Sequence, residues 1–101
     1  MKLPKDRNNY ESTLIFSPTC TIKELRIAIL DYVKQLKRLG AANIGVLFRG
    51  RRNFVYPINL AKSGYFIEIY FQSPPQAVPS LQAKYNLDTN VVRGLVLLQD
   101  S

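Results

Sequence analysis

The chain has no histidine, no tryptophan and a single cysteine, Cys20, among its 101 residues. One cysteine cannot form an internal disulfide, and without histidine it cannot complete a common zinc site or a Cys-His nucleophile pair. We therefore expect no metal site, no cofactor and no cysteine catalysis. Cys20 is interpreted as a small apolar residue near a helix start, in a protein of a reducing compartment.

Long apolar runs are also missing, since none approaches the ~20 residues that a membrane-spanning helix needs. The polar opening from Met1 to Asn9 does not fit a signal peptide, so we predict a soluble protein without a membrane partner. Acidic residues are scarce, because seven Asp and Glu oppose fourteen Lys and Arg and leave a formal net charge of +7. This balance favours nucleic acid or another anionic surface as the partner.

The rest of the composition is that of a globular protein, with 47% hydrophobic and 21% charged residues. A chain of this length builds one core, so we expect a single domain over residues 1–101. Its first eight residues are polar and basic, which is typical of a loose arm along an anionic surface.

The first half of the chain carries clear strand and helix signals. Residues 10–16 are rich in β-branched and aromatic side chains and predict a strand. Thr21 and Glu24 have the spacing of a capping box, which predicts a helix start. Apolar residues then recur every three or four positions until Gly40, which we expect to end the helix in a left-handed conformation.

The middle of the chain reads as a hairpin. A strand pattern over residues 43–58 is interrupted at Gly50, and glycine inside a strand favours a bulge. Pro57 is expected to close the hydrogen-bonded ladder, because it has no N–H to donate. Residues 59–64 are predicted to be the hairpin loop and residues 65–72 the returning strand.

A second helix and a last strand follow. Ser73 is predicted to cap the helix, with Pro74 at its first position, and the apolar pattern continues to about Tyr85. Pro79 lies either in the first turn or before the true start of this helix. A polar turn then precedes a strand over residues 91–98.

The order strand, helix, strand, strand, helix, strand predicts an α+β fold of the ferredoxin-like, split βαβ type. Four antiparallel strands would be covered on one face by two helices. Alternation places large apolar residues on the uncovered face, which indicates a protein partner or stacked bases unless the tails cover it. These residues are Phe66, Tyr70, Val92, Val96 and Leu98.

Three arginines, Arg49, Arg51 and Arg52, surround Gly50 at the point where the apolar alternation of the long strand resumes. Guanidinium suits phosphate, because its planar fork offers several N–H donors and stays protonated. A solvated basic strand end is the alternative interpretation of this segment alone.

Several blocks of this sequence resemble one known family. They are Tyr10-Glu11 before Leu14-Ile15-Phe16 and Pro18, Gly50-Arg51-Arg52 before Phe54-Val55-Tyr56-Pro57-Ile58, Gly64-Tyr65-Phe66, and Asp88 to Arg93. The chain thereby resembles bacterial-type ribosomal protein S-six, the sixth protein of the small subunit, from about Asn9 to Leu98. Its opening looks closest to cyanobacterial and plastid members.

The resemblance implies a ferredoxin-like protein that is not an enzyme and has no small-molecule substrate. Such a protein pairs with ribosomal protein S-eighteen, and the pair assembles the central domain (platform) of the small-subunit rRNA. The implied location is a ribosome in a bacterial cytoplasm or an organelle, with the plastid preferred to the mitochondrion. Tyr56 and Pro57 match a strand-ending pair that we interpret as structural.

The candidate sites follow from the resemblance together with the charge pattern. The predicted RNA-binding residues are Arg49, Arg51, Arg52, Arg93, Lys2, Lys5 and Arg7. The predicted protein-partner residues are Phe66, Tyr70 and Val96. The sequence departs from the family pattern at Asn53, Val55 and Pro79.

Two other functions share the predicted element order. A free-standing RNA-recognition module should carry a basic residue before its aromatic third-strand block, and Gly64-Tyr65-Phe66-Ile67 lacks one. An acylphosphatase-like hydrolase needs a glycine-rich anion-binding loop after its first strand. Ser17-Pro18-Thr19-Cys20 contains neither glycine nor arginine.

Overall fold

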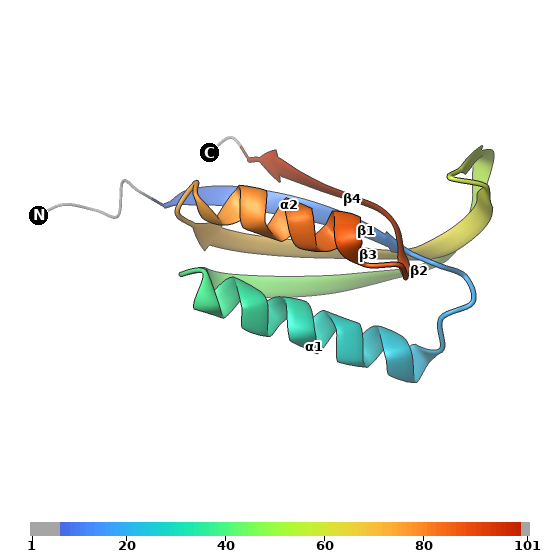
Figure 1. Cartoon of the computed structure of the whole chain (residues 1–101), viewed down its shortest axis with the longest axis horizontal. Coiled ribbons are helices and arrows are strands. Elements are labelled where there is room, and N and C mark those ends of the chain that lie inside the picture. The colour runs from blue at the N-terminus through green and yellow to red at the C-terminus, as the bar shows by residue number, and fades with distance from the viewer. Residues whose placement is uncertain (1–6, 100–101) are drawn as a thin grey trace, which may run out of the picture.

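A computed structural model describes residues 7–99, and its elements follow in the predicted order (Figure 1). They are β1 (Asn8–Phe16), α1 (Ile22–Arg38), β2 (Ala42–Ile58), β3 (Ala61–Ser73), α2 (Ala77–Leu87) and β4 (Val91–Leu98). The strands pair antiparallel in the order β2-β3-β1-β4, and both helices lie on the same face of this sheet. The predicted ferredoxin-like fold is confirmed.

The core lies between the helices and the two central strands. Alternate residues of β1 and β3 point toward the helices, and Leu14, Phe16, Ile67 and Ile69 are fully buried there. Burying each such side chain stabilises the fold by about 1.5–3 kcal/mol. The intervening residues of the same strands face the other way, so the sheet has one face that the helices leave uncovered.

Both predicted ends of α1 are confirmed. The Thr21 Oγ1 accepts a hydrogen bond from the Glu24 N–H at 3.1 Å, and the Glu24 carboxylate accepts one from the Thr21 N–H at 2.8 Å. Gly40 has a φ of +92° just after the last turn, and the Ala41 N–H reaches back to the Leu36 carbonyl at 2.9 Å. This hydrogen bond is the mark of a Schellman ending, which favours glycine.

The hairpin is tighter than predicted. Its loop is only Asn59 and Leu60, whose φ angles of +48° and +69° fit the two-residue turns that match strand twist. The prediction of a loop over residues 59–64 is wrong, because β3 already starts at Ala61 and Gly64 pairs with Arg52 of β2.

Pro57 does not end β2, which continues to Ile58. It lies in an irregular stretch between the paired residues Asn53 and Ile58, where no ladder hydrogen bond requires its missing N–H. The predicted closure of the ladder at Pro57 is therefore wrong, although the pairing is interrupted there.

The start of α2 also differs from the prediction. Ser73 is the buried last residue of β3, and its hydroxyl donates to the Pro74 carbonyl instead of capping the helix. The helix begins at Ala77, and Pro79 lies in its first turn, where a backbone N–H has no partner within the helix. Among residues 7–99, neither helix is long and apolar enough to cross a membrane.

Candidate nucleic-acid interface

The uncovered side of the sheet, called here the open face, gathers side chains from all four strands. The strand register places Gly50, Phe66, Ile15 and Arg93 in one row across β2, β3, β1 and β4. Neighbouring strands lie about 4.8 Å apart, so this row spans about 14 Å. Arg93 is thus on the same face and in the same row as the glycine of the arginine segment.

Gly50 sits at the predicted bulge. The pairing of β2 with β3 shifts by one residue between Phe48 and Gly50, and Gly50 has a φ of +86°. No atom lies within 4 Å of a Cβ built at Gly50, so the backbone angle, and not space, favours glycine there. The extra residue is Arg49, and the bulge lets both Arg49 and Arg52 reach the open face.

Arg49 is already paired within the chain. Its guanidinium forms a salt bridge with Glu68 of β3 at 3.1 Å, and the Tyr70 hydroxyl donates to the same carboxylate oxygen at 2.9 Å. The Tyr70 hydrogen bond, followed by the contacts with Arg49, holds the pKa of Glu68 below its usual range. Arg49 therefore offers a phosphate less net charge than its neighbours do.

Arg51 and Arg52 lie on opposite sides of the hairpin. The Arg52 guanidinium carbon lies 5.8 Å from the centroid of the Phe66 ring on the open face. Arg51 points the other way and donates to the Ser63 hydroxyl at 3.3 Å. Among residues 7–99, no carboxylate lies within salt-bridge distance of Arg51, Arg52 or Arg93. These three cations are available to an external anion.

The predicted cations of the N-terminal arm are not part of this cluster. Arg7 is exposed just before β1, whereas the row through Ile15 lies near the other end of that strand. Eight residues of strand separate the two positions by about 26 Å. Figure 1 shows the N-terminal end of β1 and the tip of the β2–β3 hairpin at opposite ends of the molecule. Lys2 and Lys5 lie outside the described residues.

The predicted partner residues divide between the two faces. Phe66 and Tyr70 lie half-buried on the open face, because they pair with Ile15 and Glu11 of β1. The placement of Val96 on this face is wrong: it pairs with the buried Ser12 and packs against the core. The placement of Leu98 is wrong in the same way, since it pairs with core-facing Tyr10.

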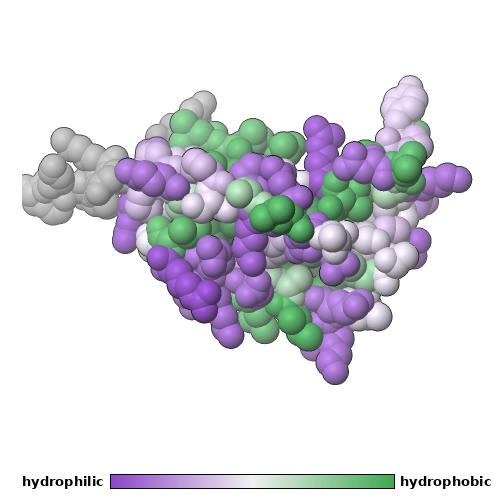
Figure 2. Space-filling view, in the orientation of Figure 1, coloured by the Kyte–Doolittle hydropathy of each residue, from purple (hydrophilic) through white to green (hydrophobic). Residues whose placement is uncertain are grey.

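The physical reason for this error is Gly94. A Cβ at Gly94 would lie 2.7 Å from the ring of Tyr85, so only glycine fits against α2 at this point. Gly94 therefore faces the helices, and Leu95 and Leu97 face away, with 43% and 59% of their surface exposed. Figure 2 shows apolar side chains along the edge of the molecule formed by β4. A glycine within a strand indicates that another part of the protein packs closely against the backbone there. This signal at Gly94 could have placed Gly94, Val96 and Leu98 on the face toward the helices.

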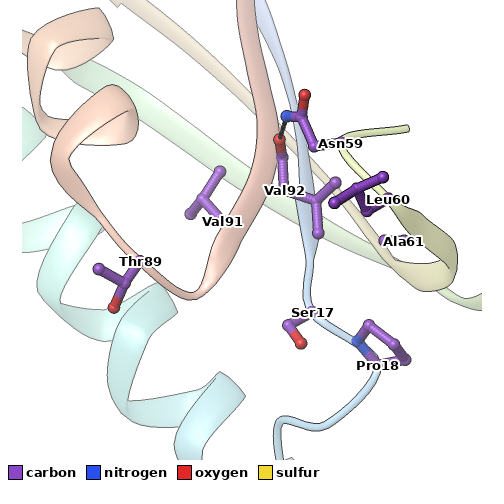
Figure 3. Close-up of a pocket in the computed structure, with 8 residues that line it drawn as sticks. All are labelled: Ser17, Pro18, Asn59, Leu60, Ala61, Thr89, Val91 and Val92. Carbon is purple, nitrogen blue, oxygen red and sulfur yellow. Dashed lines mark hydrogen bonds between the residues drawn. The ribbon is translucent and has the colours of Figure 1, made fainter. Parts of the chain in front are cut away.

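The hairpin tip is fastened to the far edge of the sheet. The Asn59 side-chain amide donates to the Val92 carbonyl at 2.7 Å (Figure 3). Between the turn, the start of β4 and the segment after β1 lies an open cavity of about 420 Å³. Its lining, Ser17, Pro18, Asn59, Leu60, Ala61, Thr89, Val91 and Val92, includes no charged side chain. The cavity therefore lacks the cationic character of Arg51, Arg52 and Arg93.

Residues 9–97, which contain this surface except for the first residue of β1 and the last of β4, match the family model described as ribosomal protein S6. The chain belongs to the ribosomal protein S6 family. It is 36% identical over 88 residues to small ribosomal subunit protein bS6c of Trieres chinensis, covering 87% of this chain and 92% of that protein. It is 30% identical over 91 residues to small ribosomal subunit protein bS6 of Trichormus variabilis, covering 90% and 84%.

The fold of this S6 family member also matches a solved structure. The crystal structure of 30S ribosomal protein S6 from Thermotoga maritima superimposes with a TM-score of 0.86 at 24% identity, covering 92% of this chain and 88% of that one. The relatives include bacterial and plastid small-subunit proteins, so the predicted location on a ribosome of a bacterial or plastid compartment is confirmed.

Proposed function

We propose that the chain is a non-catalytic constituent of the small ribosomal subunit that binds rRNA of the central domain together with ribosomal protein S-eighteen. One observation carries the proposal. Three guanidinium groups at the hairpin end of the sheet have no carboxylate partner within residues 7–99, and they belong to Arg51, Arg52 and Arg93. Membership of the S6 family favours this function over a free-standing RNA-recognition module.

The binding would be mainly electrostatic at these arginines. Each phosphate that a guanidinium neutralises releases counterions, which makes the affinity fall as salt rises. Arg52 and Arg93 would act from the open face and Arg51 from the other side of the hairpin. Such contacts carry no sequence information, so specificity must come from the shape of the RNA and from the partner protein.

The remaining predicted cations have smaller roles in this proposal. Arg49 adds to the field of the hairpin, although its salt bridge with Glu68 must open before it can bind a phosphate fully. Arg7 would contact a separate part of the RNA from the opposite end of β1, together with Lys2 and Lys5.

The apolar part of the open face is the proposed contact for S-eighteen. Phe66 and Tyr70 are retained from the prediction, and Leu95 and Leu97 take the place of Val96, which faces the core. Leu95 and Leu97 of β4 are separated from the rings of β3 by Thr13 and Glu11 of β1, so the proposed contact is a mixed surface in which exposed leucines and half-buried rings flank polar side chains.

The test is removal of charge from the hairpin. In Arg51→Ala/Arg52→Ala we expect weaker incorporation into small subunits reconstituted from rRNA and the other small-subunit proteins. The slope of log affinity against log salt should flatten by roughly 0.7–0.9 for each phosphate that is no longer neutralised. The matched control is Lys23→Ala/Lys34→Ala, which removes two exposed cations of α1. Equal behaviour of the two double variants would reject the arginine assignment.

A further inference from the structure

The hairpin contains a second, larger irregularity beyond Gly50. Asn53 pairs with Ser63 and Ile58 pairs with Ala61, so residues 54–57 of β2 stand opposite a single residue of β3, Lys62. A stretch with this excess cannot continue the flat ladder, and its residues are pushed out of the sheet. The ring of Phe54 turns inward and packs edge-on against Phe66 at 5.9 Å.

Tyr56 behaves in the opposite way to Phe54. It is 80% exposed, and the neighbouring Val55 is 90% exposed. Among the six tyrosines and five phenylalanines of the chain, Tyr56 is the most exposed. Within residues 7–99 its ring stacks on no other aromatic ring and its hydroxyl has no hydrogen-bond partner. The interpretation of Tyr56 as a structural strand-ending residue is therefore not supported by its contacts.

The backbone at Tyr56 is restricted despite this exposure. Pro57 has a fixed φ, and a residue before proline is confined to extended conformations. The turn beyond it is anchored by the hydrogen bond from Asn59 to Val92. A tyrosine has only two side-chain torsions to order, so a ring on such a backbone is presented to a partner at a low entropy cost.

The charge around Tyr56 identifies the class of partner. From Arg49 to Tyr65 the chain carries four of its fourteen Lys and Arg and none of its seven Asp and Glu. Arg51 and Arg52 precede the exposed ring, and Lys62 lies opposite its bulge. An exposed ring in a segment with four cations, of which only Arg49 is paired with a carboxylate within residues 7–99, fits a polyanion with planar groups, in which bases stack and phosphates pair with guanidinium.

We propose that Tyr56 is a stacking platform for an unpaired nucleobase of RNA whose flanking phosphates contact Arg51 and Arg52. This inference deepens the proposed function and rests on it. It assigns the tip of the hairpin a role in recognising a single-stranded or bulged nucleotide, in addition to the sequence-independent attraction of the arginines. Val55 is a neighbouring residue of nearly equal exposure without a ring.

The experiment compares four variants in subunits reconstituted from 5-iodouridine-substituted small-subunit rRNA and the other small-subunit proteins. Tyr56→Ala should weaken incorporation roughly 5- to 150-fold, the range expected for removing one base stack. Tyr56→Phe should stay within about 2-fold of wild type, since the ring remains, whereas Tyr56→Leu should resemble Tyr56→Ala. Val55→Ala is the matched control and should also stay within about 2-fold.

The salt dependence and a crosslink separate the possible outcomes. Because stacking is not an ion contact, Tyr56→Ala should keep the wild-type salt slope, and irradiation should join Tyr56 to rRNA. Wild-type incorporation of Tyr56→Ala, or crosslinks from the rRNA to other residues of the chain with none at Tyr56, would overturn the inference and leave the arginine proposal intact. If Arg51→Ala/Arg52→Ala also incorporated normally with an unchanged slope, the proposed function itself would fail.

Discussion

The two faces of the central strands are built from neighbouring residues but differ sharply. On the helix-covered face, Leu14, Phe16, Ile67 and Ile69 are fully buried and contact one another and the helices. On the open face, Phe66, Glu68 and Tyr70 are half-buried and form a mixed surface of rings, an ion pair and hydrogen bonds. Alternate residues of one strand therefore build a closed core on one side and an accessible mixed surface on the other.

The largest expected effect is on the helix-covered face. Phe16→Ala should lower the free energy of unfolding by about 3–5 kcal/mol, because it leaves a cavity in a closed core. Phe66→Ala, its matched variant on the open face, should cost clearly less, since Phe66 is only half-buried. Urea denaturation of the two variants measures both values. Equal losses would contradict the division between the faces.

A second, smaller effect concerns the pH dependence of the covered face. Burial raises the pKa of Tyr85 to about 12, although the hydrogen bond that its hydroxyl shares with Ser12 at 2.7 Å works in the other direction. A raised pKa means that the folded state holds this proton more tightly than the unfolded state does. The contribution of Tyr85 is therefore complete below pH about 10 and is lost as the pH rises toward about 12.

Over that alkaline range, the unfolding free energy should fall by about 1.4 kcal/mol per pH unit for this tyrosine. Ser12→Ala/Tyr85→Phe removes the titrating group and its buried partner together. The unfolding free energy of this variant should therefore fall with pH less steeply than that of the wild type, by about 1.4 kcal/mol per pH unit. Urea denaturation at a series of pH values gives both curves. Identical slopes would show that Tyr85 does not titrate as its burial requires.

The smallest effect on stability is expected for Glu68→Gln on the open face, where the change should alter binding to the small subunit and not the free energy of unfolding. Glu68→Gln removes the carboxylate that pairs with Arg49, and exposed ion pairs contribute little to stability. The unfolding free energy at neutral pH should stay near the wild-type value. Incorporation into small subunits should strengthen at low salt, because Arg49 becomes available to phosphate. Glu11→Gln, which leaves the Arg49 salt bridge in place, is the control, and a matching gain in it would contradict this reasoning.

The sequence was sufficient for features that are encoded locally. Thr21 and Glu24 cap each other across three residues, Gly40 needs only its own left-handed backbone, and Gly50 marks its own bulge. The element order followed from similarly short patterns. These predictions held because each depends on a few neighbouring residues.

The errors came from residues whose role is set across the fold. The sequence pattern places Gly64 in a turn, but a Cβ there would lie 2.7 Å from the Ile15 side chain and 2.8 Å from the Phe16 carbonyl. It is a glycine of close packing inside a paired strand. The face of Val96 depended in the same way on the contact of Gly94 with Tyr85: Gly94 itself signals a close contact, but its partner on α2 is known only from the fold.

The candidate site was predictable in composition but not in arrangement. Arg51, Arg52 and Arg93 are three of the seven cations that the sequence indicated, and the structure leaves these three without acidic partners in residues 7–99, whereas Arg49 is paired. The pairing of Arg49 with Glu68 depends on the bulge that turns Arg49 toward β3, and the exposure of Tyr56 depends on the register beyond Asn53. Both are properties of strand pairing, so the sequence alone could not supply them.

The hydrogen bond from Asn59 to Val92 has a mechanical consequence for the whole β2–β3 hairpin. It joins the turn of the β2–β3 hairpin to the strand at the opposite edge of the sheet, which restrains the position of the turn relative to that edge. The spacing between the charges of the hairpin and Arg93 is then set before any nucleic acid arrives. A binding surface whose geometry is set before binding loses less conformational entropy on association. Such a surface would favour an RNA whose phosphates already have the matching spacing.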